Sequence, residues 1–132
     1  MRFMLMMHAP RGNGEYAVMS WKPEELNSHV AYMHQLNRGL IESGEFVGAE
    51  GLAPPGQAKV VKSGRNGSPA VTDGPFAETK EFLVGFWIVD VESEARAHEI
   101  AARASSAPGP GGQPMSIPIE VRQVMSAPPT NE

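Results

Sequence analysis

The chain has 132 residues, of which 41% are hydrophobic and 20% charged, and its formal net charge is −4. This size suits one domain with its own core, and the acidic balance excludes the basic patch typical of nucleic-acid binding. Without cysteine there are no disulfides and no thiol chemistry, and no run of about 20 apolar residues could span a membrane. We therefore expect one domain over 1–125, a flexible tail over 126–132, and a cytoplasmic protein without nucleic-acid or membrane partners.

The first third of the chain predicts a strand, a loop and a long helix. Residues 2–9 alternate in the period of a strand, and 10–20 are rich in loop residues. A helix should begin at Pro23, because proline suits the first helical position, and end at Ser43, because Gly44 suits the position after a helix. Its apolar stripe, at the 3.6-residue period, is Leu26, Val30, Met33, Leu40 and Ile41.

The rest of the chain predicts shorter elements. In order they are an irregular stretch at 46–56, strands at 59–62 and 69–72 around a turn at 65–68, a strong strand at 83–91, a helix at 94–104 capped by Ser93, a mobile Pro/Gly/Ser-rich stretch at 105–116, and a last strand at 117–124. The order β-α-β-β-β-α-β predicts an α+β, ferredoxin-like split βαβ fold, with two helices on one face of an antiparallel sheet. The other face keeps apolar groups, so we expect a homodimer.

The segment VTDGPFAETKE, at 71–81, joins strong turn residues to an aromatic ring and four ionisable side chains. It begins the longer run VTDGPFAETKEFLVGFWIVDV. With MRFMLMMH, GEFVGAEGLAPP and IEVRQV, this run resembles the DGPF-domain branch of the YCII-related proteins over nearly the whole chain.

The resemblance implies a ferredoxin-like fold that pairs into a dimeric α/β barrel, with a pocket between the sheet and the helices. Most such proteins are uncharacterised, and some are encoded beside sigma-factor genes. Better-known YCII-type relatives are thought to use a His-Asp pair. Counted without gaps from Ser43-Gly44, their histidine falls near Met33 and their aspartate near Glu42, and His34 lies one place from the first of these.

Two residues are candidates for catalysis. Asp73 can act as a general base in a partly buried pocket, although the Gly-Pro pair after it favours a role in shaping the turn. His34 can act as a base near neutral pH, or it is a histidine at the edge of the core. The spacing of His29 and His34 is poor for binding one metal ion, and no metal motif is present, so we expect neither metal nor cofactor.

Five residues are candidates for ligand binding. Asn37 falls within the apolar stripe of the first helix, where its amide either bonds nearby backbone or projects into a wet pocket. Arg122 can clamp an anionic ligand, or pair with Glu78, Glu81 or Glu120 to fix the charged loop against the last strand. The remaining candidates belong to that loop and form either a polar site or a solvated cluster: Glu78, Lys80 and Glu81.

These residues support two hypotheses of function. The first is a small-molecule pocket with metal-independent acid–base enzyme activity, in which Asp73, His34, Asn37 and Arg122 converge. The alternative is a non-catalytic ligand-binding or regulatory module, linked to sigma-factor-dependent transcription. The residues name no substrate for either hypothesis.

Overall fold

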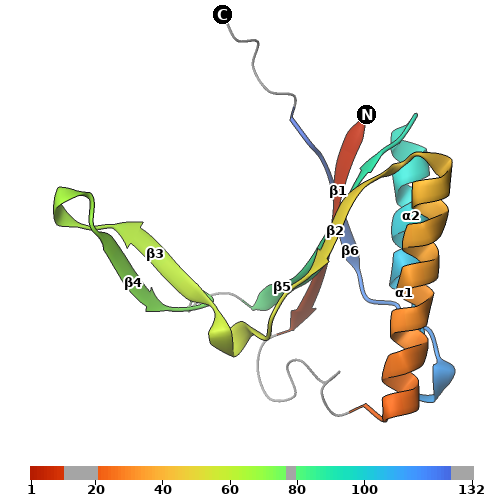
Figure 1. Ribbon diagram of the computed structural model, residues 1–132, viewed down its shortest axis with the longest axis horizontal. Helices are drawn as coiled ribbons and strands as arrows, with labels where there is room; N and C mark the ends of the chain where they lie inside the picture. The colour runs from red at the N-terminus through yellow and green to blue at the C-terminus, as the bar shows by residue number, and fades with distance from the viewer. Residues whose placement is uncertain (11–20, 77–79, 126–132) are drawn as a thin grey trace, which may run out of the picture.

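A computed structural model describes residues 1–10, 21–76 and 80–125. Its main sheet is antiparallel, with the strand order β2-β5-β1-β6. The strands are β1 (Arg2–Pro10), β2 (Phe46–Gly51), β5 (Glu81–Asp90) and β6 (Ile119–Gln123). Helices α1 (Pro23–Ser43) and α2 (Glu94–Ser105) both lie on one side of this sheet (Figure 1). The protein therefore has the predicted ferredoxin-like α+β fold.

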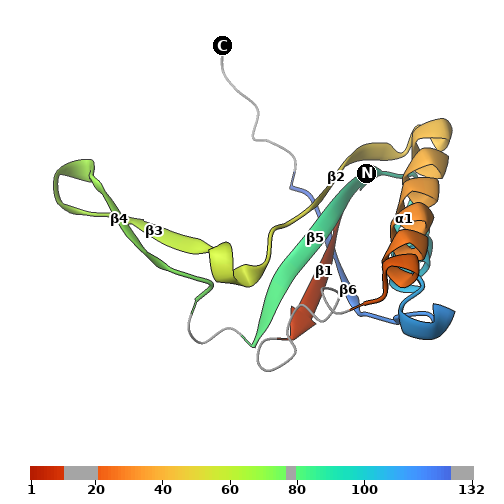
Figure 2. The same cartoon turned by 60° about the horizontal axis from the view of Figure 1, so that its bottom comes forward.

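The alternation of β1 divides the sheet into a helix face and an open face. Phe3, Leu5 and Met7 are buried under the helices. On β5 the buried residues alternate in the same way, and Leu5 lies opposite Trp87 in the register. The open face carries half-buried apolar side chains at Met4, Met6, Phe86 and Ile88. No helix in the described part of the chain packs on that face (Figures 1 and 2).

Helix α1 begins and ends as predicted, but its buried face is rotated from the predicted stripe. Pro23 is its first residue, and Gly44 ends it with a φ of 80°, in the left-handed region that glycine adopts without a steric penalty. Leu36 and Leu40 are the buried residues of the helix. The predicted stripe is therefore wrong at three positions, which flank the contact with the sheet and are 40–60% exposed: Leu26, Val30 and Ile41.

Strand β2 is absent from the predicted elements, because its glycines suggested an irregular stretch. The structure pairs it with the edge of β5, which satisfies its backbone groups. Glycine is required on the partner strand, where a Cβ atom at Gly85 would lie 2.8 Å from the Glu50 carbonyl oxygen. β2 is therefore defined by its close contact with β5, whereas a strand prediction depends on an alternating side-chain pattern.

The predicted hairpin is present but does not join the main sheet. Strands β3 (Lys59–Ser63) and β4 (Pro69–Asp73) form a separate two-stranded sheet. It projects away from the sheet on the side opposite the helices (Figures 1 and 2). Its valine pair, Val61 opposite Val71, is more than half exposed. The hairpin is therefore attached to the body through its base.

The segment 105–116, whose composition predicted mobility, is folded against the start of α1. The Gly111 N–H donates to Glu25 Oε2 at 2.7 Å, and this bond helps lower the pKa of that carboxyl. The Pro108 carbonyl lies 3.0 Å from His29 Nδ1. Within the segment, the Met115 N–H donates to the Ala107 carbonyl. Backbone hydrogen bonding therefore organises a stretch that has few apolar anchors.

Helix α2 is tied to the chain that follows α1 by an ion pair. It is capped as predicted, since the Ser93 hydroxyl accepts from the Arg96 N–H at 3.1 Å. The Arg96 guanidinium donates two hydrogen bonds of 2.9 Å each to the Glu45 carboxylate, and the Glu45 side chain is only 15% exposed. No helix in the described residues is long and apolar enough to cross a membrane.

Candidate functional site

Two cavities lie at the end of the sheet from which the hairpin departs. The first, the helix-side cleft, has a volume of about 380 Å³ and lies between α1 and strands β2 and β5. Cavities of this size commonly hold small molecules. The lining residues with polar or titratable side chains are His29, His34, Asn37, Glu50 and Trp87, of which Glu50 lies opposite Phe86 in the register, on the open face. Its apolar side chains come from Met7, Val30, Met33, Ala49 and Val84, and the cleft also reaches Gly51, Gly85 and Phe86 along β2 and β5.

Asn37 is held in the helix-side cleft by Trp87. The Trp87 Nε1–H donates to Asn37 Oδ1 at 2.8 Å, and both residues line the cleft. An indole N–H can only donate, so it must face the amide oxygen rather than the amide nitrogen. The amide is thereby oriented, and its Nδ2 group makes no other hydrogen bond to the described residues. Asn37 is thus a positioned donor on the wall of the cleft, and its partner is a side chain rather than the nearby backbone that the sequence offered as one alternative.

His34 lines the same cleft, one helical turn before Asn37. Residues three apart on a helix have Cβ atoms about 5–6 Å apart, so the imidazole and the amide are neighbours. His34 is exposed and makes no hydrogen bond to the part of the chain that the structure describes. Its ring is therefore available to exchange a proton with a molecule in the cleft.

His29 closes the end of the cleft nearest the start of α1. Its Nδ1 lies 3.0 Å from the Pro108 carbonyl, which can only accept, so the proton of the neutral ring is on Nδ1. The Trp21 ring packs edge-on against it, with 5.4 Å between ring centroids. The segment 105–116 thus fixes the orientation of one wall residue.

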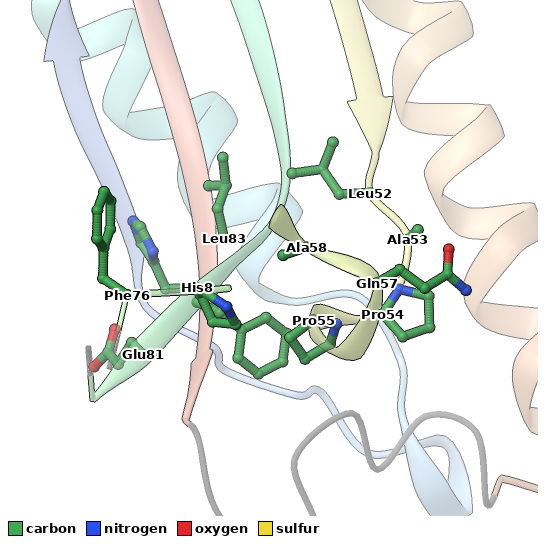
Figure 3. A pocket seen from close by; sticks show the side chains of 12 residues that line it. His8, Leu52, Ala53, Pro54, Pro55, Gln57, Ala58, Phe76, Glu81 and Leu83 are labelled. Carbon is green, nitrogen blue, oxygen red and sulfur yellow. The ribbon is translucent and has the colours of Figure 1, made fainter. Parts of the chain in front are cut away.

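The second cavity, the hairpin-base cavity, has a volume of about 510 Å³ and is mostly apolar. Figure 3 shows His8, Phe76 and Glu81 on one side of it and Leu52, Pro54 and Gln57 on the other. The His8 Nε2 lies 3.2 Å from Glu120 Oε1 on β6. The two cavities are separated by the sheet itself, since Met7 lines the helix-side cleft and its neighbour His8 lines this one.

The structure brings His34 and Asn37 together and keeps the other predicted residues out of the helix-side cleft. Asp73 lies on the hairpin, 92% exposed, and its carboxylate is 2.7 Å from Lys59 Nζ. Glu81 lines the hairpin-base cavity. The others lie on the surface or outside the described residues: Lys80 and Arg122 are exposed and line neither cavity, and Glu78 lies outside the described residues.

The expected convergence of Asp73 and Arg122 with the helix residues does not occur within one chain. Asp73 belongs to the projecting hairpin, and Arg122 is opposite Met4 on the open face of the sheet. Glu120, one of the partners predicted for Arg122, bonds His8 instead. A role for either residue in the helix-side cleft would therefore need another chain.

Sequence reasoning missed Trp87 and His29 as wall residues. Trp87 occupies an apolar strand and was indistinguishable from a core residue, although a buried indole N–H usually has a partner. His29 was weighed only as a metal ligand. In the described residues no three histidine, aspartate or glutamate side chains are arranged to hold a metal ion.

Comparison with known proteins gives a family and one relative. The family model of the YCII-related domain matches residues 1–109. A protein of Rhizobium meliloti (strain 1021), described only as uncharacterised, is 33% identical over 95 residues. That match covers 72% of this chain and 76% of the relative. The name of the relative carries neither a ligand nor a reaction.

Proposed function

The chain belongs to the YCII-related domain family, and from this premise we propose that its helix-side cleft binds a small molecule and performs metal-independent acid–base chemistry on it. The observation that carries the proposal is the oriented Asn37 amide on the wall of a cleft of about 380 Å³. Binding pockets fix their ligands with a few precisely placed polar groups, and functional side chains are commonly held in place by a second side chain. We propose in addition that the chain belongs to the DGPF branch of the family and that the protein is cytoplasmic, as its sequence predicts.

His34 is the acid–base group of the proposed site. Histidine exchanges a proton near neutral pH, and this one stands beside the oriented amide. Asp73, the other predicted base, is not part of the proposed site, because its carboxylate is solvent-exposed on the hairpin.

Asn37→Leu is expected to abolish binding in the helix-side cleft, because it removes both the donor and the partner of Trp87. The measurement is ligand-observed NMR with a library of small fragments, followed by the shift of the Trp87 indole N–H resonance. Asn27→Leu, on an exposed turn of the same helix, is the matched control and should keep every hit. Hits that move the Trp87 resonance and survive Asn37→Leu would contradict the proposed site.

The alternative function is a non-catalytic binding or regulatory module that uses the same cleft. Its support is that His34 has no orienting partner among the described residues, whereas catalytic histidines are commonly held by one. The two functions differ in the effect of His34→Asn on bound fragments. Under the enzyme hypothesis the variant binds a substrate but no longer converts it, and under the alternative no fragment is converted by either protein.

We also propose that the protein is a homodimer joined through the open face of the sheet. Met4, Met6, Phe86 and Ile88 form an apolar patch there, and exposed contiguous patches commonly mark interfaces.

Ile88→Glu would place a charge in this patch and is expected to give a monomer. Light scattering at micromolar concentration measures the mass, and Val61→Glu on the hairpin is the control. A wild-type protein with the mass of one chain would refute the proposal.

A further inference from the structure

Resting on the proposed function, we infer that the helix-side cleft takes a neutral carbonyl compound. Asn37 binds its oxygen, and His34 moves a proton to and from the carbon next to the carbonyl. Three observations carry this inference: the direction of the Asn37 amide, its spacing from His34, and the charge of the cleft wall.

The first observation is that the cleft presents a hydrogen-bond donor and not an acceptor at Asn37. Trp87 occupies the amide oxygen with a 2.8 Å bond, which leaves the two hydrogens of Nδ2 for the contents of the cleft. An uncharged donor that is already positioned is suited to an oxygen that gains negative charge during a reaction. A carbonyl oxygen that becomes an enolate oxygen is such a group.

The second observation is that the base stands at the right distance from this donor. His34 and Asn37 are three residues apart on α1, so their Cβ atoms are about 5–6 Å apart and point to one face. A carbonyl oxygen and the hydrogen on the adjacent carbon lie within such a span. A small carbonyl compound can therefore contact both side chains at once.

The third observation is that the described residues lining the cleft include one acidic residue, Glu50, and no lysine or arginine. The Glu50 side chain is exposed and lies opposite Phe86 in the register, on the open face, and the other lining side chains are mostly apolar. An anionic ligand would be desolvated there without a cation to pair with it, which is costly. The substrate is therefore neutral where it contacts the cleft.

The proton transfer balances without any other reactant. An unprotonated His34 nitrogen takes the proton from the α-carbon, and the C–H electron pair becomes the carbon–carbon double bond of an enolate. The carbonyl π pair moves onto oxygen, which accepts a hydrogen bond from Asn37 Nδ2. Return of a proton from the imidazolium to the same carbon restores the ketone.

The experiment follows α-hydrogen exchange of 1-indanone in D₂O by NMR, with the wild-type protein as catalyst. Asn37→Asp is the sharpest variant, because its carboxylate still accepts from Trp87 while the Nδ2 donor is lost. We expect Asn37→Asp and His34→Asn each to slow the protein-dependent exchange about 100-fold. Circular dichroism and the position of the Trp87 indole resonance show whether each variant is folded. His34→Gln is a second variant that removes the proposed general base.

His98→Asn is the matched control, because His98 lies on α2 and lines neither described cavity; it should exchange 1-indanone like the wild type. A ring-carboxylate derivative of 1-indanone should bind at least tenfold more weakly than the parent ketone. Binding of 1-indanone that shifts the Trp87 resonance without exchange would overturn the inference and leave the proposed binding site intact. Absence of binding at millimolar ketone would also overturn it, while fragment hits at Trp87 would still support the proposed function.

Discussion

Replacing Leu5 with alanine is expected to lower the free energy of unfolding by about 3 kcal/mol, because the side chain is completely buried and its loss leaves a cavity. Leu5 lies at the centre of β1, between Trp87 on β5 and Val121 on β6. The neighbouring strands are held by backbone bonds and cannot collapse fully into the space. Urea denaturation, compared at equal protein concentration and with an unchanged slope, measures the loss.

Leu26→Ala is the matched control for this prediction. Leu26 is 40% exposed on α1, so the same chemical change there should alter stability by only about 0.5 kcal/mol. Leu5→Ala should also move the Trp87 indole resonance, because Trp87 is its partner in the register. Equal effects of the two substitutions would contradict the placement of β1 at the centre of the core.

Glu45→Gln is expected to cost about 2 kcal/mol at neutral pH, because it replaces two charge-assisted bonds to Arg96 with weaker neutral ones. The Arg96 guanidinium holds the pKa of the Glu45 carboxyl below its ordinary value, and the Ser43 hydroxyl assists. The carboxylate therefore adds stability that is fully present above the unfolded-state pKa, about 4.5, and is lost as the pH falls through the lower folded value.

The pH dependence makes the Glu45 prediction specific. The difference in unfolding free energy between wild type and Glu45→Gln should shrink as the pH is lowered below about 4.5. Glu99→Gln removes a carboxylate from the same arginine at an exposed position and should cost less than about 1 kcal/mol. A Glu45→Gln effect no larger than that of Glu99→Gln would show that the pair is solvent-screened.

Most of the fold was predictable because its elements carry local signals. Pro23 and Gly44 mark the ends of α1, Ser93 marks the start of α2, and the alternation over residues 2–9 marks β1. β2 was not predictable in this way, because its glycines interrupt the side-chain pattern and its place in the sheet depends on pairing with β5, where Gly85 allows the close approach. The segment 105–116 was missed for a related reason, since its anchors are backbone groups that meet α1.

The site was predictable only as far as one helix could show it. His34 and Asn37 share a helix, and their spacing alone places them together. Trp87 is 50 residues from Asn37 in the chain, and its role depends on the position of β5 under α1. Asp73 and Arg122 were candidates because of their chemistry, yet the hairpin and the open face carry them away from the cleft.

The projecting hairpin also affects how freely this part of the chain can vary among relatives. Strands β2 and β5 pair directly, and the Leu52 N–H bonds the Val84 carbonyl where the chain departs toward the hairpin. The four-stranded sheet is therefore complete without β3 and β4. The entropic cost of a longer connection between β2 and β5 grows only slowly with its length. Insertions and deletions between β2 and β5 can thus reshape the hairpin-base cavity over evolution while the helix-side cleft keeps its geometry.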